Sequence, residues 1–345
     1  MTNVALIGLG MVADTHLAAI RDATSANLIG VLGRDKIKAQ AFAKKATASI
    51  GQPVRLYQTI DELAHDDTLD FAIIATPPDA RQQFVAKLVQ AKKPILVEKP
   101  IERTLEAAQM IVELCENNAL PLGVVLQHRA RSASVELKNL IDAGELGEIA
   151  AVELRVPWWR EQSYYDAPGR GTFARDGGGV LINQAIHTID LAHWLLGPIE
   201  AVQAMLTTTP LHELEAEDWA GAVFRLRSGA VGTLVATTSA YPGDTESILI
   251  SGTLGSARLH SGVVKIDFLD GTSKNLGAQA STGGGADPMA FTHDWHQSII
   301  EDFTRCLGTN DTPIASGRSA LMAQATIEAM SIASRSGQTT EVVEV

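Results

Sequence analysis

A glycine run followed by a polar helix face is the part of this sequence that is richest in reactive side chains. The glycines at 177–179 allow the backbone to come close to another group. In the helix predicted to follow, Asn183, His187 and Asp190 stand at i, i+4 and i+7 and so share a face. Such a face on an apolar helix is costly unless it meets polar partners or a wet cleft. This pattern fits a functional site in a cleft, and it fits equally well a His187 that is hydrogen-bonded in the core. The offset of His193 from His187 does not suit a shared metal, and we predict no metal site.

A second turn, near the amino terminus, could bind phosphate. Gly8-Leu9-Gly10-Met11-Val12-Ala13 follows the pattern GxGxxA. In that pattern the first glycine permits a tight turn, the second lets the backbone approach a pyrophosphate, and the alanine lets the helix pack closely on the strand. The helix amino terminus attracts the anion. The pattern predicts dinucleotide binding by Gly8, Leu9, Gly10, Met11 and Val12, although a plain tight turn would also fit it.

Short apolar strands alternate with helices around these residues through the first part of the chain. The predicted strands cover 4–7, 28–32, 71–75, 95–97 and 122–126. The predicted helices end near 23, span 35–47, begin near 59, and cover 79–92 and 104–118. This alternation indicates a doubly wound parallel sheet. The apolar start of the chain fits the first strand better than a signal peptide.

Several notable residues fall at the carboxyl ends of these strands, where such sheets bind ligands. Besides the Gly8 turn they are Gly33-Arg34, Thr76-Pro77, Glu98-Lys99-Pro100 and Gln127-His128-Arg129. Arg34 takes the place where an acidic residue usually binds the ribose diol, and a guanidinium suits a 2′-phosphate. The sequence therefore favours NADP over NAD. Stacking of Arg34 on adenine, or simple exposure, would fit as well.

After about residue 130 the alternation of predicted strands and helices gives way to a series of successive strands. The predicted strands lie at 149–156, 199–207, 220–227, 231–239, 247–251, 257–260 and 263–268, with helices at 133–143, 292–307 and 319–334. Successive strands with glycine-containing turns indicate a large, mostly antiparallel open sheet in an α+β domain. We therefore predict an α/β protein with a dinucleotide-binding domain at 1–124 and a substrate-binding and oligomerisation domain at 125–345. Its C-terminal helices could pack back on the first domain.

Composition limits the choice of partners. The chain has 345 residues and a net charge of −12, and an acidic surface repels nucleic acid and anionic membranes. No apolar run is long enough for a membrane span. The two cysteines, Cys115 and Cys306, show no metal or redox spacing and are expected to be reduced. We expect a cytoplasmic protein with no nucleic-acid or membrane partner.

Taken together, these motifs resemble the glucose–fructose oxidoreductase, inositol dehydrogenase and rhizopine-catabolism family, called Gfo/Idh/MocA. The resemblance covers nearly the whole chain. It depends on Gly8-Leu9-Gly10, on Ala75-Thr76-Pro77-Pro78, on Glu98-Lys99-Pro100, and on Gly177-Gly178-Gly179 leading to Asn183 and His187.

The resemblance implies an N-terminal Rossmann domain and a dehydrogenase that transfers a hydride between NAD(P) and a sugar or polyol. It implies that Lys99 and His187 flank the reacting carbon, with His187 as the acid or base because imidazole titrates near neutrality. Many relatives carry Asp where this chain has Asn183. Since an amide cannot act as a base, we expect Asn183 to bind a hydroxyl. Glu98 is expected near the nicotinamide ribose, and the Lys99–Pro100 bond could be cis.

Further residues are candidates for the two binding sites. Aromatic and hydrogen-bonding side chains suit a carbohydrate ring, which makes substrate-pocket candidates of Trp159, Arg160, Tyr164, Tyr165, Arg170 and His128. Thr76, Pro77 and Gln127 join the candidates for cofactor binding. The loop from Ser281 to Asp287 is expected to be flexible and to border the site or to be a plain linker.

Two other functions stay open, and an assembly is expected. One is a cofactor-binding regulator without catalysis. The other is redox-assisted glycoside cleavage, in which bound NAD transiently oxidises a ring carbon. Because a bare apolar sheet face is a liability, we predict a homodimer or homotetramer that forms through the open sheet.

Overall fold

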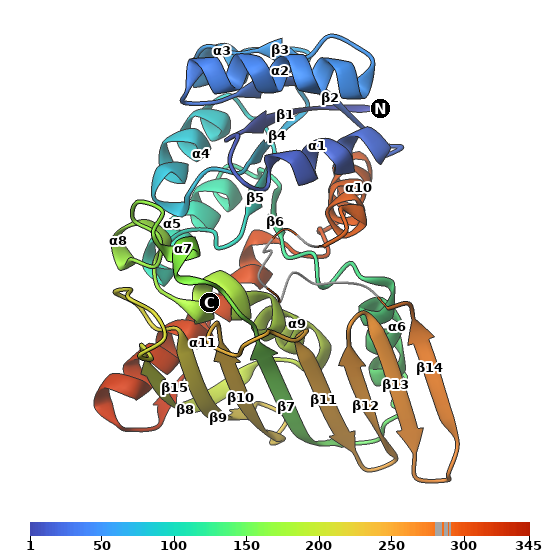
Figure 1. The fold of residues 1–345 in the computed structure, drawn as a ribbon. Coiled ribbons are helices and arrows are strands. Elements are labelled where there is room, and N and C mark those ends of the chain that lie inside the picture. The colour runs from blue at the N-terminus through green and yellow to red at the C-terminus, as the bar shows by residue number, and fades with distance from the viewer. Residues whose placement is uncertain (280–284, 286–288, 290) are drawn as a thin grey trace. The chain divides into compact units, whose positions relative to one another are not determined.

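The chain folds into two compact units, each described here by itself. The computed structural model describes residues 1–279, 285, 289 and 291–345 (Figure 1). Unit 1 comprises Met1–Glu102, Glu106–Gln127 and His293–Ala320, and unit 2 comprises Arg103–Leu105, His128–Thr292 and Leu321–Val345. Apart from Gly285, the loop expected at Ser281–Asp287 lies outside the described residues.

Unit 1 is built on a six-stranded parallel sheet, which contains the five predicted strands and a further short strand, β3, that the sequence did not indicate. The strand order is β3-β2-β1-β4-β5-β6. The bounds are β1 Thr2–Ile7, β2 Ala26–Leu32, β3 Arg55–Leu56, β4 Phe71–Ile74, β5 Ile95–Glu98 and β6 Leu122–Val125. In this order the connections leave β1 in opposite directions, so the switch point lies between β1 and β4, where dinucleotides bind.

Helices cover both faces of this sheet. They are α1 Ala13–Asp22, α2 Lys36–Ile50, α3 Ile60–Ala64, α4 Arg81–Gln90, α5 Leu105–Glu116 and α10 Asp294–Thr309, with a 3₁₀ turn at Pro78–Ala80. Thr59 caps the start of α3, because its hydroxyl accepts from the Glu62 amide at 3.1 Å. Although α10 is distant in sequence, it packs against α1, and Gln297 donates to the carbonyl of Asp22 at 3.0 Å.

Unit 2 contains a nine-stranded sheet in the order β14-β13-β12-β11-β7-β10-β9-β8-β15. All of its pairings are antiparallel except β7 with β10. The strands are β7 Ile149–Pro157, β8 Ile199–Thr207, β9 Trp219–Leu226, β10 Val231–Thr237, β11 Ser247–Gly252, β12 Gly255–His260, β13 Val263–Phe268, β14 Ser273–Gly277 and β15 Thr340–Glu341. The expected large and mostly antiparallel sheet is confirmed.

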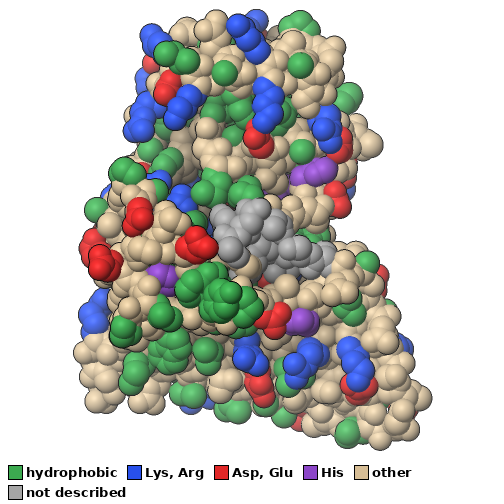
Figure 2. Space-filling model, in the orientation of Figure 1, with side chains coloured by type: hydrophobic (Ala, Val, Ile, Leu, Met, Phe, Trp, Pro, Cys, Tyr) green, Lys and Arg blue, Asp and Glu red, His purple; other side chains and the backbone are tan. Residues whose placement is uncertain are grey.

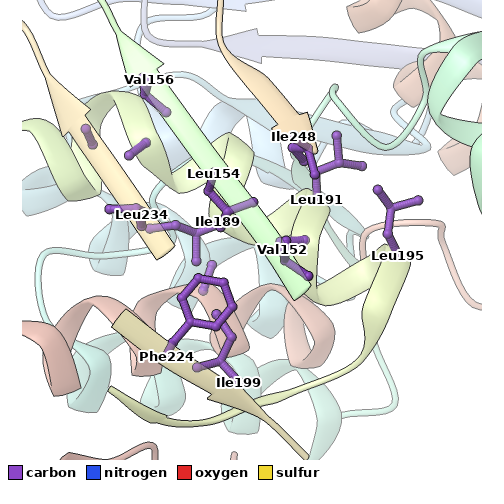
Figure 3. Close-up of a cluster of buried hydrophobic side chains, with 14 of the residues drawn as sticks. Val152, Leu154, Val156, Ile189, Leu191, Leu195, Ile199, Phe224, Leu234 and Ile248 are labelled. Carbon is purple, nitrogen blue, oxygen red and sulfur yellow. The ribbon is translucent and has the colours of Figure 1, made fainter. Parts of the chain in front are cut away.

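Helices pack on one face of this sheet and form the core of unit 2. They are α6 Ser132–Asp142, α9 Ile186–Leu196 and α11 Gly317–Ser336, whose first residues belong to unit 1, with two short helices, α7 Gln162–Tyr165 and α8 Phe173–Asp176. Leu154 and Leu234 point from the sheet toward Ile189 of α9, with Phe224 beside them (Figure 3). This packing buries one face of α9 and so fixes the direction of its polar residues.

The other face of the sheet has no covering layer among the described residues. Four apolar side chains on β8, β9 and β10 are exposed there: Met205 (66%), Val223 (54%), Val231 (56%) and Val235 (43%). Hydrophobic side chains gather over this part of the sheet, while charged ones are frequent toward β12 and β13 (Figure 2).

Two smaller observations complete the fold. The Lys99–Pro100 peptide bond, for which a cis form was one possibility, is cis, and so is Tyr241–Pro242. Within the part of the chain that the structure describes, no helix combines the length and the apolar character that crossing a membrane requires.

Candidate functional site

The turn after β1 has the geometry of a phosphate cradle. Gly8 has a φ of 97°, and a Cβ built on it would lie 2.6 Å from the backbone of Ala75. A Cβ on Gly10 would meet nothing within 4 Å, so the turn is open on that side. No side chain caps α1 at Val12, its N-cap residue. A tight turn, an open approach and an uncapped helix start all fit a pyrophosphate.

The end of β2 lies beside this turn. A Cβ on Gly33 would lie 2.9 Å from the Leu9 side chain, so the two segments pack closely. Asp35 caps α2, because its carboxylate accepts from the amides of Ile37 and Lys38 at 3.0 and 3.1 Å. The Asp35 carboxylate is therefore engaged in capping α2, whereas the Arg34 side chain is exposed.

The ends of β4 and β5 carry the other predicted cofactor residues of unit 1. Thr76 is half-buried and Pro77 is exposed immediately after β4. Glu98 closes β5 and is buried, whereas Lys99, which follows it, is half-buried. Gln127, two residues beyond β6, is also buried.

Glu98 is the hub of a buried cluster that the sequence did not predict. His16 of α1 bonds its carboxylate through Nε2 at 2.8 Å, and Nε2 of His296 on α10 lies 3.7 Å from the same oxygen. Burial acts to raise the pKa of Glu98, but the two histidines outweigh it and hold that pKa well below its ordinary value. The carboxylate is therefore charged, and its direction is set by these side chains rather than by solvent.

These three residues also have the composition of a metal site. One ligand atom from each lies within 4.8 Å of the other two. Two ligands at 2.0–2.1 Å from a tetrahedral zinc stand about 3.3 Å apart, which is wider than the 2.8 Å between His16 and Glu98. The spacing fits a shared proton better than a cation.

In unit 2, the glycine run packs against the chain's own backbone. A Cβ on Gly177 would lie 2.6 Å from the carbonyl oxygen of Arg103, and one on Gly179 would lie 1.8 Å from that of Glu217. The Glu217 carboxylate accepts from the amides of Gly179 and Leu181, each at 3.1 Å. The close backbone approach that the glycines were expected to allow is therefore made to Arg103 and Glu217, and it holds the turn that precedes α9 in place.

Asn183 belongs to that turn. Instead of one continuous α-helix, the chain forms a π-turn over Leu181–Ala185 and only then α9. The Asn183 amide donates to the carbonyls of Gly178 and Gly179 at 2.8 and 3.0 Å, which a carboxylate could not do. The amide nitrogen therefore stabilises the glycine turn. That Asn183 binds a substrate hydroxyl stays a prediction.

His187 lies in the first turn of α9 and is 5% exposed. Its ring stacks on that of His128, with 4.8 Å between centroids and 26° between planes. Nε2 of His128 lies 3.8 Å from Glu246, which also pairs with Arg131 at 2.7 Å. The structure thus brings His128 and His187 together and supports them with a buried carboxylate.

Asp190 has a partner other than His187. Its carboxylate is bound by Arg129, the residue next to His128. The shared polar face that the helix spacing predicted is therefore divided among separate partners, with Asn183 on the glycine turn, His187 on His128 and Asp190 on Arg129.

Several of the predicted pocket residues gather at the segment after β7. The Arg170 guanidinium lies 4.3 Å from the Tyr164 ring centroid, and that of Arg160 lies 5.6 Å from it. Arg160 is 2% exposed and donates to the carbonyl of Gly285 at 2.6 Å. Trp159 is half-buried. Tyr164 and the two arginines thus form one cluster.

Tyr165 is turned inward. Its hydroxyl lies 2.6 Å from the Thr238 hydroxyl, and burial raises its pKa. Its ring contacts His212, whose Nδ1 lies 2.7 Å from Asp218. Through Nε2, His212 is also 2.8 Å from the carbonyl of Arg160. Tyr165 therefore helps to anchor this segment, and its contact with substrate stays a prediction.

The supporting residues that sequence reasoning missed are His16, Glu217, Glu246, Asp218 and His296. Except for Asp218, which lies six residues from His212, each is distant in sequence from its partner, so no local spacing reveals it. The available signal was an ionisable side chain in an apolar setting, as with His16 on α1 and His296 on α10.

Comparison with known proteins matches both units. Residues 2–126 match an oxidoreductase family with an NAD-binding Rossmann fold, and residues 134–258 match the GFO/IDH/MocA C-terminal domain. The chain is 26% identical to a D-apiose dehydrogenase of Paraburkholderia graminis, over 98% of this chain and 89% of that protein. It is 27% identical to inositol 2-dehydrogenase 2 of Saccharopolyspora erythraea, over 75% of this chain and 73% of that protein.

A solved structure extends the comparison over the whole chain. The WlbA dehydrogenase from Bordetella pertussis, crystallised with NADH and UDP-GlcNAcA, is 28% identical to this chain. The match covers 100% of this chain and 99% of that one, with a TM-score of 0.81.

Proposed function

Since the chain belongs to the Gfo/Idh/MocA family of NAD-binding oxidoreductases, we propose that it transfers a hydride between NAD(P) and a hydroxyl or keto carbon of a sugar, an inositol or a sugar derivative. The family includes sugar and polyol dehydrogenases. Lys99 carries the proposal, because it stands at the carboxyl end of β5, on the ligand-binding edge of the sheet that also bears the phosphate turn.

In the proposed site, unit 1 holds the cofactor. The turn from Gly8 to Val12 binds the pyrophosphate at the uncapped start of α1. Thr76, Pro77 and Gln127 would also contribute to the cofactor site, with Glu98 near the nicotinamide ribose. When bound, the nicotinamide supplies the acceptor or donor of the hydride.

We assign proton transfer to His187 and Lys99. In oxidation, His187 takes the proton from the substrate hydroxyl as the hydride leaves, and in reduction it returns the proton. The imidazole suits this role because it titrates near neutrality. Stacking on His128 orients the ring, and Lys99 polarises the substrate oxygen or relays the proton.

The substrate pocket is proposed to be that of a carbohydrate. Trp159 and Tyr164 offer aromatic faces to a sugar ring, with Arg160 and Arg170 beside Tyr164. His128, Asn183 and Tyr165 contribute further polar groups. The sugar-nucleotide in the WlbA structure and the apiose and inositol of the named relatives support this substrate class.

A spectrophotometric screen of sugars, sugar acids, nucleotide sugars and polyols, with NAD⁺ and NADP⁺ in parallel, tests the proposal. Reduction of the cofactor by at least one compound is the expected result. On that compound, Lys99→Ala and His187→Ala should each lose most of the turnover. Wild-type turnover in both variants would rule out the proposed roles.

The same screen separates the two other functions. Cofactor binding without turnover of any compound would indicate a regulator. Cofactor retained through purification, with glycoside cleavage and no net NADH, would indicate redox-assisted cleavage.

We further propose that the open face of the unit 2 sheet is a subunit interface. The exposed side chains of Met205, Val223, Val231 and Val235 lie on neighbouring strands, and such apolar patches mark interaction sites. A second copy of the chain is the expected partner, giving a homodimer or a homotetramer.

A further inference from the structure

Arg81, the first residue of α4, is a charged side chain that the structure buries almost completely, with 2% exposure. Its guanidinium is directed at backbone carbonyls. Nε and Nη2 donate to the carbonyl of Thr76 at 3.0 and 2.9 Å. Nη1 donates to the carbonyls of Glu98 and Pro100 and lies 3.4 Å from that of Ile101. The fork geometry of arginine allows one side chain to bind two separate segments.

These carbonyls belong to the two turns at the ligand-binding edge of the sheet. Thr76 follows β4, and the other three residues surround Lys99 at the end of β5. The backbone of Ala75 and Thr76 also packs against Gly8, where an added Cβ would lie 2.6 Å from either residue. Arg81 therefore ties the Lys99 turn to the phosphate turn by way of Thr76.

The charge of Arg81 is matched by nearby carboxylates. Burial lowers its pKa to about 10, while Glu98 and Glu102 act to raise it, so the guanidinium stays protonated at neutral pH. The Glu98 side chain is held from the other direction by His16 and His296, which come from α1 and α10. The residue before Lys99 is thus fixed by its carbonyl and by its carboxylate.

From these contacts we infer that Arg81 is a positioning residue that fixes Lys99 for proton transfer, aided by His16 and His296. The inference rests on the proposed function, because Lys99 is assigned to catalysis there. Arg81 acts through the backbone on both sides of Lys99, since the carbonyls before and after that residue accept its donors. Loss of these bonds would let Lys99 move while the strand itself remains paired with β4 and β6.

The test compares Arg81→Met with Arg81→Lys and with a matched control, Lys93→Met. Lys93 is also a cation that binds backbone, since Nζ donates to the carbonyls of Asp66 and Leu69 at 3.0 and 2.7 Å. It lies just before β5, at the strand end opposite to Lys99. Lys93→Met therefore removes a comparable tie from the same unit without disturbing the Lys99 turn.

Two measurements need no turnover. In hydrogen–deuterium exchange of the protein with NAD(P)H added, Arg81→Met should speed exchange in peptides covering 98–103 more than elsewhere. It should also change the rate at which an amine-reactive reagent labels Lys99, measured by mass spectrometry. Arg81→Lys should restore part of both effects, and Lys93→Met should produce neither. His296→Leu should change Lys99 labelling in the same direction, and His296→Gln should do so less.

Kinetics on the substrate found in the screen complete the test. A displacement of about 1 Å costs about 100-fold in rate, so kcat of Arg81→Met should fall 10- to 100-fold while KM for substrate changes less than threefold. A uniform rise in exchange with a parallel loss of cofactor affinity would overturn the inference, as would an unchanged kcat. If the wild-type protein turned over nothing, the proposed function would fail, and the exchange and labelling results would still decide whether Arg81 fixes Lys99.

Discussion

The guanidinium of Arg129 binds both carboxylate oxygens of Asp190, with Nε–Oδ2 and Nη2–Oδ1 distances of 2.8 and 2.5 Å. Both side chains are almost fully buried. Burial raises the pKa of Asp190, and Arg129 opposes that rise. The pair joins the residue beside His128 to the α9 turn after His187, so it fixes the two segments that carry the stacked histidines.

Arg129→Met should destabilise the protein by about 3–5 kcal/mol, because it leaves a buried carboxylate without its counter-charge. Urea unfolding measures the loss. The double variant Arg129→Met/Asp190→Leu should recover much of it, since it removes the stranded charge as well. An Arg129→Met protein as stable as the wild type would show that the pair contributes nothing to the fold.

Gly8→Ala should impair folding and cofactor binding together. The new Cβ would strike the backbone of Ala75 and Thr76 at 2.6 Å, and the φ of 97° is unfavourable for alanine. Gly10→Ala is the control for sterics, because its Cβ meets no protein atom within 4 Å. That variant should keep the wild-type melting temperature yet bind cofactor more weakly, as cofactor titration by fluorescence would show. Full affinity in Gly10→Ala would argue against a pyrophosphate at this turn.

Arg34→Ala should weaken the binding of NADPH more than that of NADH, because we propose that the guanidinium binds the 2′-phosphate. The side chain is exposed at the end of β2, whereas Asp35 is held by its capping bonds to α2. A guanidinium on a 2′-phosphate contributes a charged hydrogen bond of about 1.5–3 kcal/mol, so the affinity for NADPH should fall about 10- to 100-fold while that for NADH stays nearly constant. Equal effects on both cofactors would mean that Arg34 stacks on adenine or contacts the shared phosphates.

His193 should make the protein less stable as the pH falls. Burial and, to a lesser extent, Arg129 lower its pKa to about 3 from the ordinary 6.5. Between these two pH values His193 binds a proton in the unfolded chain but not in the folded chain. The contribution of neutral His193 to the free energy of unfolding is therefore complete above pH 6.5 and declines as the pH falls below it. One proton corresponds to about 1.4 kcal/mol per pH unit. In urea unfolding between pH 7.5 and pH 5, the free energy of unfolding of His193→Gln should decline less than that of the wild type. The control His65→Gln, at an exposed histidine, should decline as much as the wild type.

Val223→Asp together with Val235→Asp should dissociate the proposed oligomer. Both side chains are exposed on the open sheet face, at 54% and 43%, and a buried aspartate there would lack a partner. Light scattering after size-exclusion chromatography should show a larger assembly for the wild type and the 36.7 kDa monomer for the variant. Leu269→Asp, at an exposed apolar residue in the turn after β13, is the control and should keep the wild-type mass. A monomeric wild type would rule out the interface.

The elements that the sequence predicted well are those with a local signal. Strands β4, β5 and β6 of unit 1 are buried throughout and appear as short apolar runs, such as Phe71–Ile74, whereas β3 is short, partly exposed and was not predicted. The GxGxxA pattern placed the turn before α1 correctly. By contrast, β14 is mostly exposed and lacks alternating apolar residues, so nothing in its sequence marked it as a strand.

The partners of the site residues could not be predicted, because they depend on tertiary packing. Asn183 was expected on an α-helical face, but Glu217 binds the amides of Gly179 and Leu181 and helps to hold a π-turn there. That Glu98 lies near the ribose stays a prediction, but the bond from its carboxylate to His16, 82 residues away, was not foreseen. In both cases a buried polar group took its direction from a residue that no spacing rule connects to it.

The position of α10 in unit 1 has a consequence for biosynthesis. The ribosome completes the strands of unit 1 by Val125, but α10, which packs on α1 and brings His296 to Glu98, begins only at Asp294. At about 5–20 residues per second, the intervening chain takes roughly 10 to 30 seconds to make. Through that interval the nascent domain lacks both the helix that packs on α1 and the histidine that stands beside Glu98.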